Sequence, residues 1–214
     1  MSKIVIVDDH PSTREGLTTR IDVESDLQVC GEADDVDGAL RLIRDQEPDI
    51  AVSDISLKTG SGIELIKAVK AEKLKTRMLA WSMYDDSLYA ERALRAGAMG
   101  YVNKVHVTDR IIDAIRTVLK GDIYLSPELS AKLLQRVVIG KNAAGHSPAD
   151  TLSDRELQTF ELIGRGKNTA DIAKAMQLSP KTVETYRARI KEKLELEDMA
   201  SLARAAVQWV IENG

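Results

Sequence analysis

The first 120 residues alternate short apolar runs with stretches that carry apolar residues at helical spacing. The apolar runs fall at residues 3–7, 27–33, 49–54, 77–81 and 100–103, and helical patterns follow at about 12–21, 36–46, 61–69, 85–96 and 108–120. Short β-branched runs indicate strands, and strands that alternate with helices pair in parallel. The pattern predicts an α/β fold with a five-stranded, doubly wound parallel sheet, and we expect Ser12 or Thr13 to cap the first helix.

Polar side chains stand where these predicted strands end. Asp8 and Asp9 end the first strand, Asp54 the third and Ser82 the fourth, and Lys104 follows the fifth. The carboxyl ends of parallel strands share one rim, where ligands bind in open α/β sheets. Considered alone, Asp54 could equally cap a helix that starts near Ser61, and each of the others has an ordinary structural explanation. Their joint occurrence on one rim favours a chemical site.

Three clustered carboxylates need a cation between them, because each would otherwise raise the pKa values of the others. Hard oxygen ligands suit Mg²⁺, and a magnesium ion beside a carboxylate is suited to phosphoryl transfer. Asp54 would then be the nucleophile, with Lys104 and Ser82 directed at phosphoryl oxygens.

The segment between residues 121 and 150 changes character. Ser126 followed by Pro127 predicts the start of a helix near 127–138. Residues 140–148 are rich in small residues and show no periodicity, which predicts a flexible linker in which His146 faces solvent. We therefore expect domains at 1–121 and 151–214, joined by a linker at 122–150.

The last 64 residues predict an all-helical module. Ser153 and Glu156 have the spacing of a capping box, and two short helices follow at about 169–176, capped by Thr169, and 180–194. The later helix carries Val183, Ile190 and Leu194 as a buried stripe, together with five cationic residues: Lys181, Arg187, Arg189, Lys191 and Lys193. This arrangement predicts a helix-turn-helix that places its later helix in the major groove. The alternative is a solvated helix on an interaction domain, because the module holds ten Lys and Arg against ten Asp and Glu.

The sequence also bears on the cellular compartment of the protein. The single Cys30 excludes an internal disulfide framework, the N-terminus lacks the apolar core of a signal peptide, and no apolar run approaches the ~20 residues of a membrane span. We expect a cytoplasmic protein without membrane contact.

The rim residues resemble a known signature. Asp8-Asp9, Asp54, Ser82 and the Tyr101-Val102-Asn103-Lys104 stretch resemble the receiver domain of two-component response regulators over residues 3–120. The resemblance implies that Asp54 is the phosphoacceptor, that Asp9 binds Mg²⁺ directly and Asp8 through water, and that the carbonyl of Ser56 completes the coordination. Ser82 and Tyr101 would form the switch pair. Lys58 stands where the family usually has Pro, and Trp81 where an aliphatic residue is commoner.

The C-terminal module resembles the LuxR-type helix-turn-helix, which places the chain in the NarL/FixJ class. The match rests on Leu152–Glu156, Asp171–Ala173, Ser179–Tyr186, Ile190 and Lys193-Leu194. It implies that Lys181 and Thr182 lie near phosphates, that Glu184, Thr185 and Ala188 face base edges, and that Arg187, Arg189 and Lys193 also contact DNA. Tyr186 and Glu184 stand where the family often has His and a cation. Residues 199–210 would form the dimer helix or pack on the module's own core.

Together these features predict a DNA-binding regulator rather than an enzyme. A sensor histidine kinase would phosphorylate Asp54, and phosphorylation would either release the C-terminal module or promote a homodimer on double-stranded DNA. Two alternatives remain open at this point: an aspartyl-phosphate enzyme, and a protein-interaction regulator that has lost DNA binding.

Overall fold

The computed structural model describes residues 1–57, 59–83, 87–104, 107–138 and 148–213. It divides into two compact units, Met1–Asn142 and Ala143–Gly214, which we describe separately. Lys58, His146 and most of the expected flexible linker lie outside the described residues.

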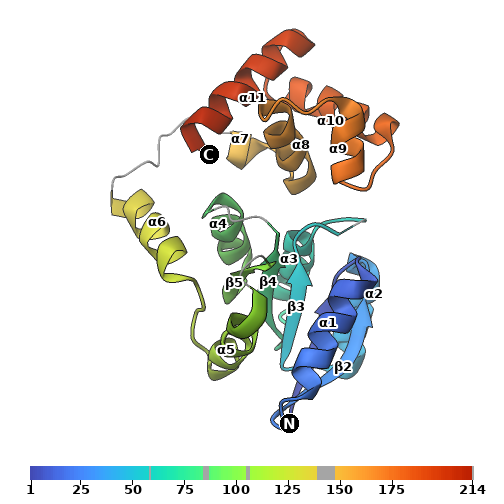
Figure 1. Ribbon diagram of the computed structural model, residues 1–214, viewed down its shortest axis with the longest axis vertical. Coiled ribbons are helices and arrows are strands. Elements are labelled where there is room, and N and C mark those ends of the chain that lie inside the picture. The colour runs from blue at the N-terminus through green and yellow to red at the C-terminus, as the bar shows by residue number, and fades with distance from the viewer. Residues whose placement is uncertain (58, 84–86, 105–106, 139–147, 214) are drawn as a thin grey trace. The chain divides into compact units, whose positions relative to one another are not determined.

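The first unit contains the predicted five-stranded parallel sheet (Figure 1). Its strand order is β2-β1-β3-β4-β5. The strands are β1 Ser2–Val7, β2 Leu27–Ala33, β3 Ile50–Asp54, β4 Arg77–Ser82 and β5 Gly100–Asn103, and the helices are α1 Pro11–Asp22, α2 Val36–Gln46, α3 Gly62–Ala71, α4 Ser87–Ala96, α5 Val107–Lys120 and α6 Pro127–Val138. The doubly wound prediction is confirmed.

Alternating strand residues supply the two apolar layers. Ile4 and Ile6 of β1 belong to the buried cluster that also contains Leu17 of α1 and Ile115 of α5. Val5 and Val7 are equally buried but point to the opposite face, where α2, α3 and α4 pack side by side. Burial on both faces explains why these strands are continuously apolar.

Helix starts follow local capping chemistry. Ser61 caps α3 in a full capping box with Glu64, which fixes the backbone just after β3. The expected cap of α1 by Ser12 or Thr13 is wrong: the N-cap is His10, and Pro11 occupies the first turn. Proline suits that position because its missing N–H and fixed φ cost nothing there.

The chain continues past α5 along the free edge of the sheet. The N–H of Tyr124 donates to the carbonyl of Met99 and the N–H of Tyr101 donates to the carbonyl of Tyr124, both at 3.0 Å. This pairing extends β5 by a parallel bridge, and α6 then packs against α4. The segment from Tyr124 through α6 therefore belongs structurally to the first unit.

The second unit is all-helical, as predicted. Its helices are α7 Pro148–Thr151, α8 Asp154–Gly164, α9 Thr169–Ala175, α10 Pro180–Lys193 and α11 Met199–Asn213. Ser153 and Glu156 form the expected capping box. The cap of α9 is Asn168 rather than Thr169, because the Asn168 side chain accepts the N–H of Asp171.

Helix α11 packs on α8. Leu202 and Ala206 are fully buried, and the rings of Phe160 and Trp209 lie 6.0 Å apart. Leu202 and Ala206, which were expected in a dimer helix, therefore belong to the unit's own core. Val207, from the same expected face, is 42% exposed. None of the helices in the described parts of the chain is long and apolar enough to cross a membrane.

Candidate phosphoacceptor and nucleic-acid sites

The rim residues converge on one lysine. The Lys104 ammonium lies 2.6 Å from Asp8 Oδ2 and 2.6 Å from Asp54 Oδ2. Asp8 directly follows β1 and Asp54 ends β3; these strands pair side by side, so the sheet itself brings the two carboxylates together. The three side chains are almost fully buried. Lys104 thus bridges two carboxylates that are 46 residues apart in sequence and offsets one of their two negative charges.

Burial dominates the electrostatics of Asp54. It raises the pKa of this carboxyl above its ordinary value; the Lys104 ammonium opposes that effect and the Asp8 carboxylate adds to it. The N–H of Ser56 donates to Asp54 Oδ1 at 3.1 Å. Asp54 is therefore an oriented carboxylate whose charge is costly in the resting state.

Four side chains at the rim could hold a metal ion. One ligand atom from each of Asp8, Asp9, His10 and Asp54 lies within 4.8 Å of the others. Asp9 Oδ1 is buried and lies 2.8 Å from His10 Nδ1; a carboxylate oxygen has two lone-pair sites, so one remains for a cation. His10, whose Nδ1 lies 2.8 Å from Asp9 Oδ1, was not anticipated, although it directly follows the aspartate pair.

Arg14 supports the acidic loop and was also missed by sequence reasoning. It donates from Nη1 to the carbonyl of Asp8 at 2.6 Å and from Nε to Glu32 at 3.0 Å. Thr18, one turn later on α1, donates to the same Glu32. The i, i+4 spacing of Arg14 and Thr18 was the only available signal for this arrangement.

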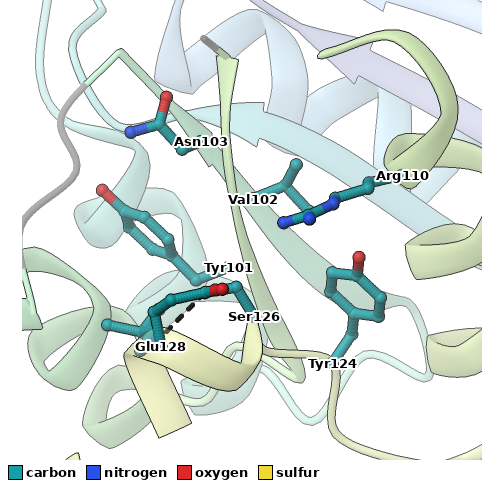
Figure 2. A pocket seen from close by; sticks show the side chains of 8 residues that line it. Tyr101, Val102, Asn103, Arg110, Tyr124, Ser126 and Glu128 are labelled. Atoms are coloured by element: carbon teal, nitrogen blue, oxygen red, sulfur yellow. Dashed lines mark hydrogen bonds between the residues drawn. The ribbon is translucent and has the colours of Figure 1, made fainter. Parts of the chain in front are cut away.

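The expected switch residues occupy adjacent strands. Ser82, fully buried, ends β4, and Tyr101, also buried, lies in β5. Figure 2 shows Tyr101 beside a pocket that Tyr124, Arg110 and Glu128 also line. The pocket has a volume of about 260 Å³. Trp81 lies next to the site, with the Lys104 ammonium 5.9 Å from its ring centroid.

Helix α10 presents the expected nucleic-acid residues on one exposed side. Val183 and Ile190 face the core, whereas the outward residues Lys181, Glu184, Thr185, Ala188 and Arg189 are exposed and Thr182 is half-buried. Ser179 caps the helix by accepting the N–H of Thr182, and Thr185 donates to the carbonyl of Lys181. These bonds cap and support the first turn of α10, from which its outward side chains project.

Two of the expected DNA contacts have partners inside the unit. Lys193 lies 2.6 Å from Glu156 Oε2, so its ammonium ties α10 to the capping box of α8. Arg187 donates to Thr169 Oγ1 and lies 3.5 Å from Glu184 Oε1. Thr169, which the sequence predicted to cap α9, instead contacts Glu184 and Arg187.

Comparison with known proteins agrees with this arrangement. Residues 4–116 match the family described as "Response regulator receiver domain", and residues 150–206 match "Bacterial regulatory proteins, luxR family". The chain is 33% identical over 210 residues to the oxygen regulatory protein NreC of Staphylococcus carnosus, covering 96% of this chain and 97% of the relative. It is 33% identical over 209 residues to the response regulator GacA of Pseudomonas aeruginosa, covering 97% and 96%.

A crystal structure of a LuxR-family two-component response regulator from Aurantimonas sp. SI85-9A1 is also similar. It superposes with a TM-score of 0.60 at 34% identity, covering 64% of this chain and 99% of that one. A receiver with an acidic rim, joined to a helix-turn-helix, defines the class of phosphorylation-linked DNA-binding regulators. The chain belongs to the response regulator family, and within it to the NarL/FixJ class, which combines a receiver domain with a LuxR-type DNA-binding domain.

Proposed function

We propose that Asp54 accepts a phosphoryl group from the phosphohistidine of a sensor histidine kinase. The nitrogen–phosphorus bond of the donor breaks as an oxygen–phosphorus bond to the Asp54 carboxylate forms. The observation that carries the proposal is the buried Lys104 ammonium at 2.6 Å from both Asp54 and Asp8. From this position the ammonium can donate a hydrogen bond to an oxygen of the phosphoryl group once that group is attached to Asp54. Ser82 stands at the end of the next strand to bond a second oxygen.

The donor set fits Mg²⁺. Carboxylate oxygens are the ligands this ion prefers, and one ligand atom from each of Asp8, Asp9 and Asp54 lies within 4.8 Å of the others. Asp9, Asp54 and the carbonyl of Ser56 would hold the ion, with Asp8 beside it. When bound, Mg²⁺ supplies neutralisation of charge on the transferred group.

The output of the switch is control of DNA binding in transcription. The phosphoryl group adds a charge of about −1.5 to −2, which draws Lys104 and Ser82 toward it, and Tyr101 follows. Coupling of this kind is typically ~1–3 kcal/mol. It would release the C-terminal domain or favour a homodimer, in which α10 reads double-stranded DNA through the residues Lys181, Thr182, Glu184, Thr185, Arg187, Ala188, Arg189 and Lys193.

The domain borders belong to the same proposal: a receiver over 1–121, a connecting segment over 122–150 whose first part, through α6, packs on the receiver, and a DNA-binding domain over 151–214, acting in the cytoplasm. We propose no substrate turnover. Hydrolysis of small phosphate esters at a rate that Asp54→Asn abolishes would favour an aspartyl-phosphate enzyme instead.

Phosphoryl uptake can be measured with acetyl phosphate and Mg²⁺. Wild-type protein should gain one phosphoryl group, seen by intact mass, and Asp54→Asn should gain none. Asp22→Asn, which removes an exposed carboxylate at the end of α1, is the matched control and should be labelled like the wild type. Undiminished labelling of Asp54→Asn would refute the assignment.

DNA binding can be measured by fluorescence anisotropy over a range of salt concentrations. Lys181→Gln should lower the slope of log affinity against log salt by about 1, because one phosphate contact is lost. Lys120→Gln, at the end of α5, should leave the slope unchanged. A wild-type protein without salt-dependent DNA affinity would favour the protein-interaction alternative.

A further inference from the structure

Three side chains at the junction of α9 and α10 form a hydrogen-bonded group, which we call the Thr169 cluster: Thr169, Glu184 and Arg187. Thr169 Oγ1 donates to Glu184 Oε1 at 2.6 Å, and Arg187 Nη1 donates to Thr169 Oγ1 at 2.5 Å. Arg187 also lies 3.5 Å from Glu184 Oε1. A hydroxyl has one proton to donate and lone pairs to accept, so Thr169 can serve both partners at once.

The cluster fixes the Glu184 carboxylate on the outward side of α10. The Glu184 side chain is 52% exposed, whereas that of Arg187 is 21% exposed. A glutamate on an exposed helix normally samples many rotamers. Here the described contacts of Glu184 all fall on Oε1, so Oε2 is available to a partner outside the protein.

Charge explains why a carboxylate is tolerable in a helix that approaches DNA. Glutamate alone would be repelled by phosphates, but the Arg187 guanidinium lies beside it and offsets its charge. Because Arg187 bonds Thr169 and lies beside Glu184, its guanidinium is placed to support Glu184.

The chemistry of a carboxylate selects the base. An ionised carboxylate only accepts hydrogen bonds. In the major groove guanine and thymine offer it acceptors, and adenine offers a donor beside the N7 acceptor, whereas the cytosine edge offers the N4 amino donor. A fixed carboxylate therefore favours cytosine over the other three bases.

We propose that Glu184 selects a cytosine in the recognised DNA, and that Thr169 and Arg187 are positioning residues that hold its carboxylate for this contact. The inference rests on DNA binding by α10. It adds α9 to the elements that determine sequence specificity, through the first residue of that helix.

The test is selection of bound sequences from random DNA by the full-length, acetyl phosphate-treated protein, followed by competition binding with all four bases at the selected position. Wild type should prefer cytosine by roughly 5- to 150-fold, the range expected for one good base contact. Glu184→Gln should shift the preference toward adenine, because an amide both donates and accepts.

Two variants test the positioning residues. Thr169→Val, which keeps the side-chain shape, should weaken the cytosine preference several-fold while binding to non-specific DNA stays unchanged. Thr169→Ser should restore the preference, and Ser201→Ala, a hydroxyl deletion on α11, should not alter it. Arg187→Met removes the donor to Thr169 and should weaken the preference even if Thr169→Val does not fold.

These outcomes distinguish the role of the Glu184 carboxylate, the role of its positioning residues, and DNA binding itself. An unchanged cytosine preference in Glu184→Gln would overturn the role of the carboxylate. A full preference in folded Thr169→Val and Arg187→Met would overturn the positioning role. Failure of the wild type to bind any DNA would instead contradict the proposed function.

Discussion

Replacement of Lys104 by methionine tests how strongly one ammonium supports the acidic rim. Methionine keeps most of the aliphatic stem but removes the charge that lies 2.6 Å from both Asp8 and Asp54. Removing one partner of a buried ion pair typically costs ~3–5 kcal/mol. Since two carboxylates lose their partner, we expect the free energy of unfolding of the receiver to fall by ~3–5 kcal/mol.

Protonation of Asp54 limits the loss of stability in this variant. Burial already raises the pKa of Asp54, so this carboxyl can take up a proton when Lys104 is absent. For a unit of this size, roughly 3–5 °C in Tm accompanies each kcal/mol, and the expected decrease is about 10–20 °C. The variant should also regain more stability from Mg²⁺ than the wild type does, because the ion then replaces a missing charge; saturation at a hundred times Kd contributes about 2.7 kcal/mol.

The assay is thermal unfolding by circular dichroism near neutral pH, without and with saturating Mg²⁺. Lys120→Met, an exposed lysine in the last turn of α5, is the matched control and should unfold like the wild type. If Lys104→Met unfolds at the wild-type temperature, and Mg²⁺ stabilises the two proteins equally, the carboxylates do not depend on Lys104 and the reasoning fails.

Other consequences can be checked separately. Gly62→Ala should destabilise the receiver by about 1–3 kcal/mol in urea unfolding, because its Cβ would lie 2.0 Å from the Asp54 carbonyl oxygen; Gly16→Ala in α1, where no described atom lies within 4 Å, should instead gain roughly 0.5–1 kcal/mol. Burial acts to raise the pKa of Glu156, but bonds from Lys193 and Ser153 hold it below its ordinary 4.5. The stability advantage of wild type over Glu156→Gln should therefore be full above about pH 4.5 and decline as pH falls, which urea titrations at several pH values can follow; an advantage that grows in acid would contradict the sign. In a Trp209→Phe background, Trp81 emission should change on phosphorylation, and an unchanged spectrum would exclude Trp81 as a reporter.

The sheet and its acidic rim could be predicted because both follow from local pattern and parallel topology. Each of the five strands is a short apolar run, and Asp8, Asp54 and Lys104 follow strands whose carboxyl ends must share one rim. Residues 96 positions apart in sequence could thus be placed together without any knowledge of their contacts.

Helix caps were less predictable where two capping residues are adjacent. Asn168 and Thr169 can both cap a helix, and Asn168 does so here. This frees the Thr169 hydroxyl for Glu184 and Arg187, 15 and 18 residues later. No periodicity encodes such a contact, because it depends on how α9 and α10 cross.

The pairing of Tyr124 with β5 has a consequence for how this protein can be divided and recombined. The family match ends at residue 116. Tyr124, which lies beyond that border, forms hydrogen bonds with Met99 and Tyr101 inside it. A receiver excised there would leave the N–H of Tyr101 and the carbonyl of Met99 without these partners on an open sheet edge, where another chain could pair. A chimaera or isolated receiver that behaves as a monomer should therefore retain the chain through α6.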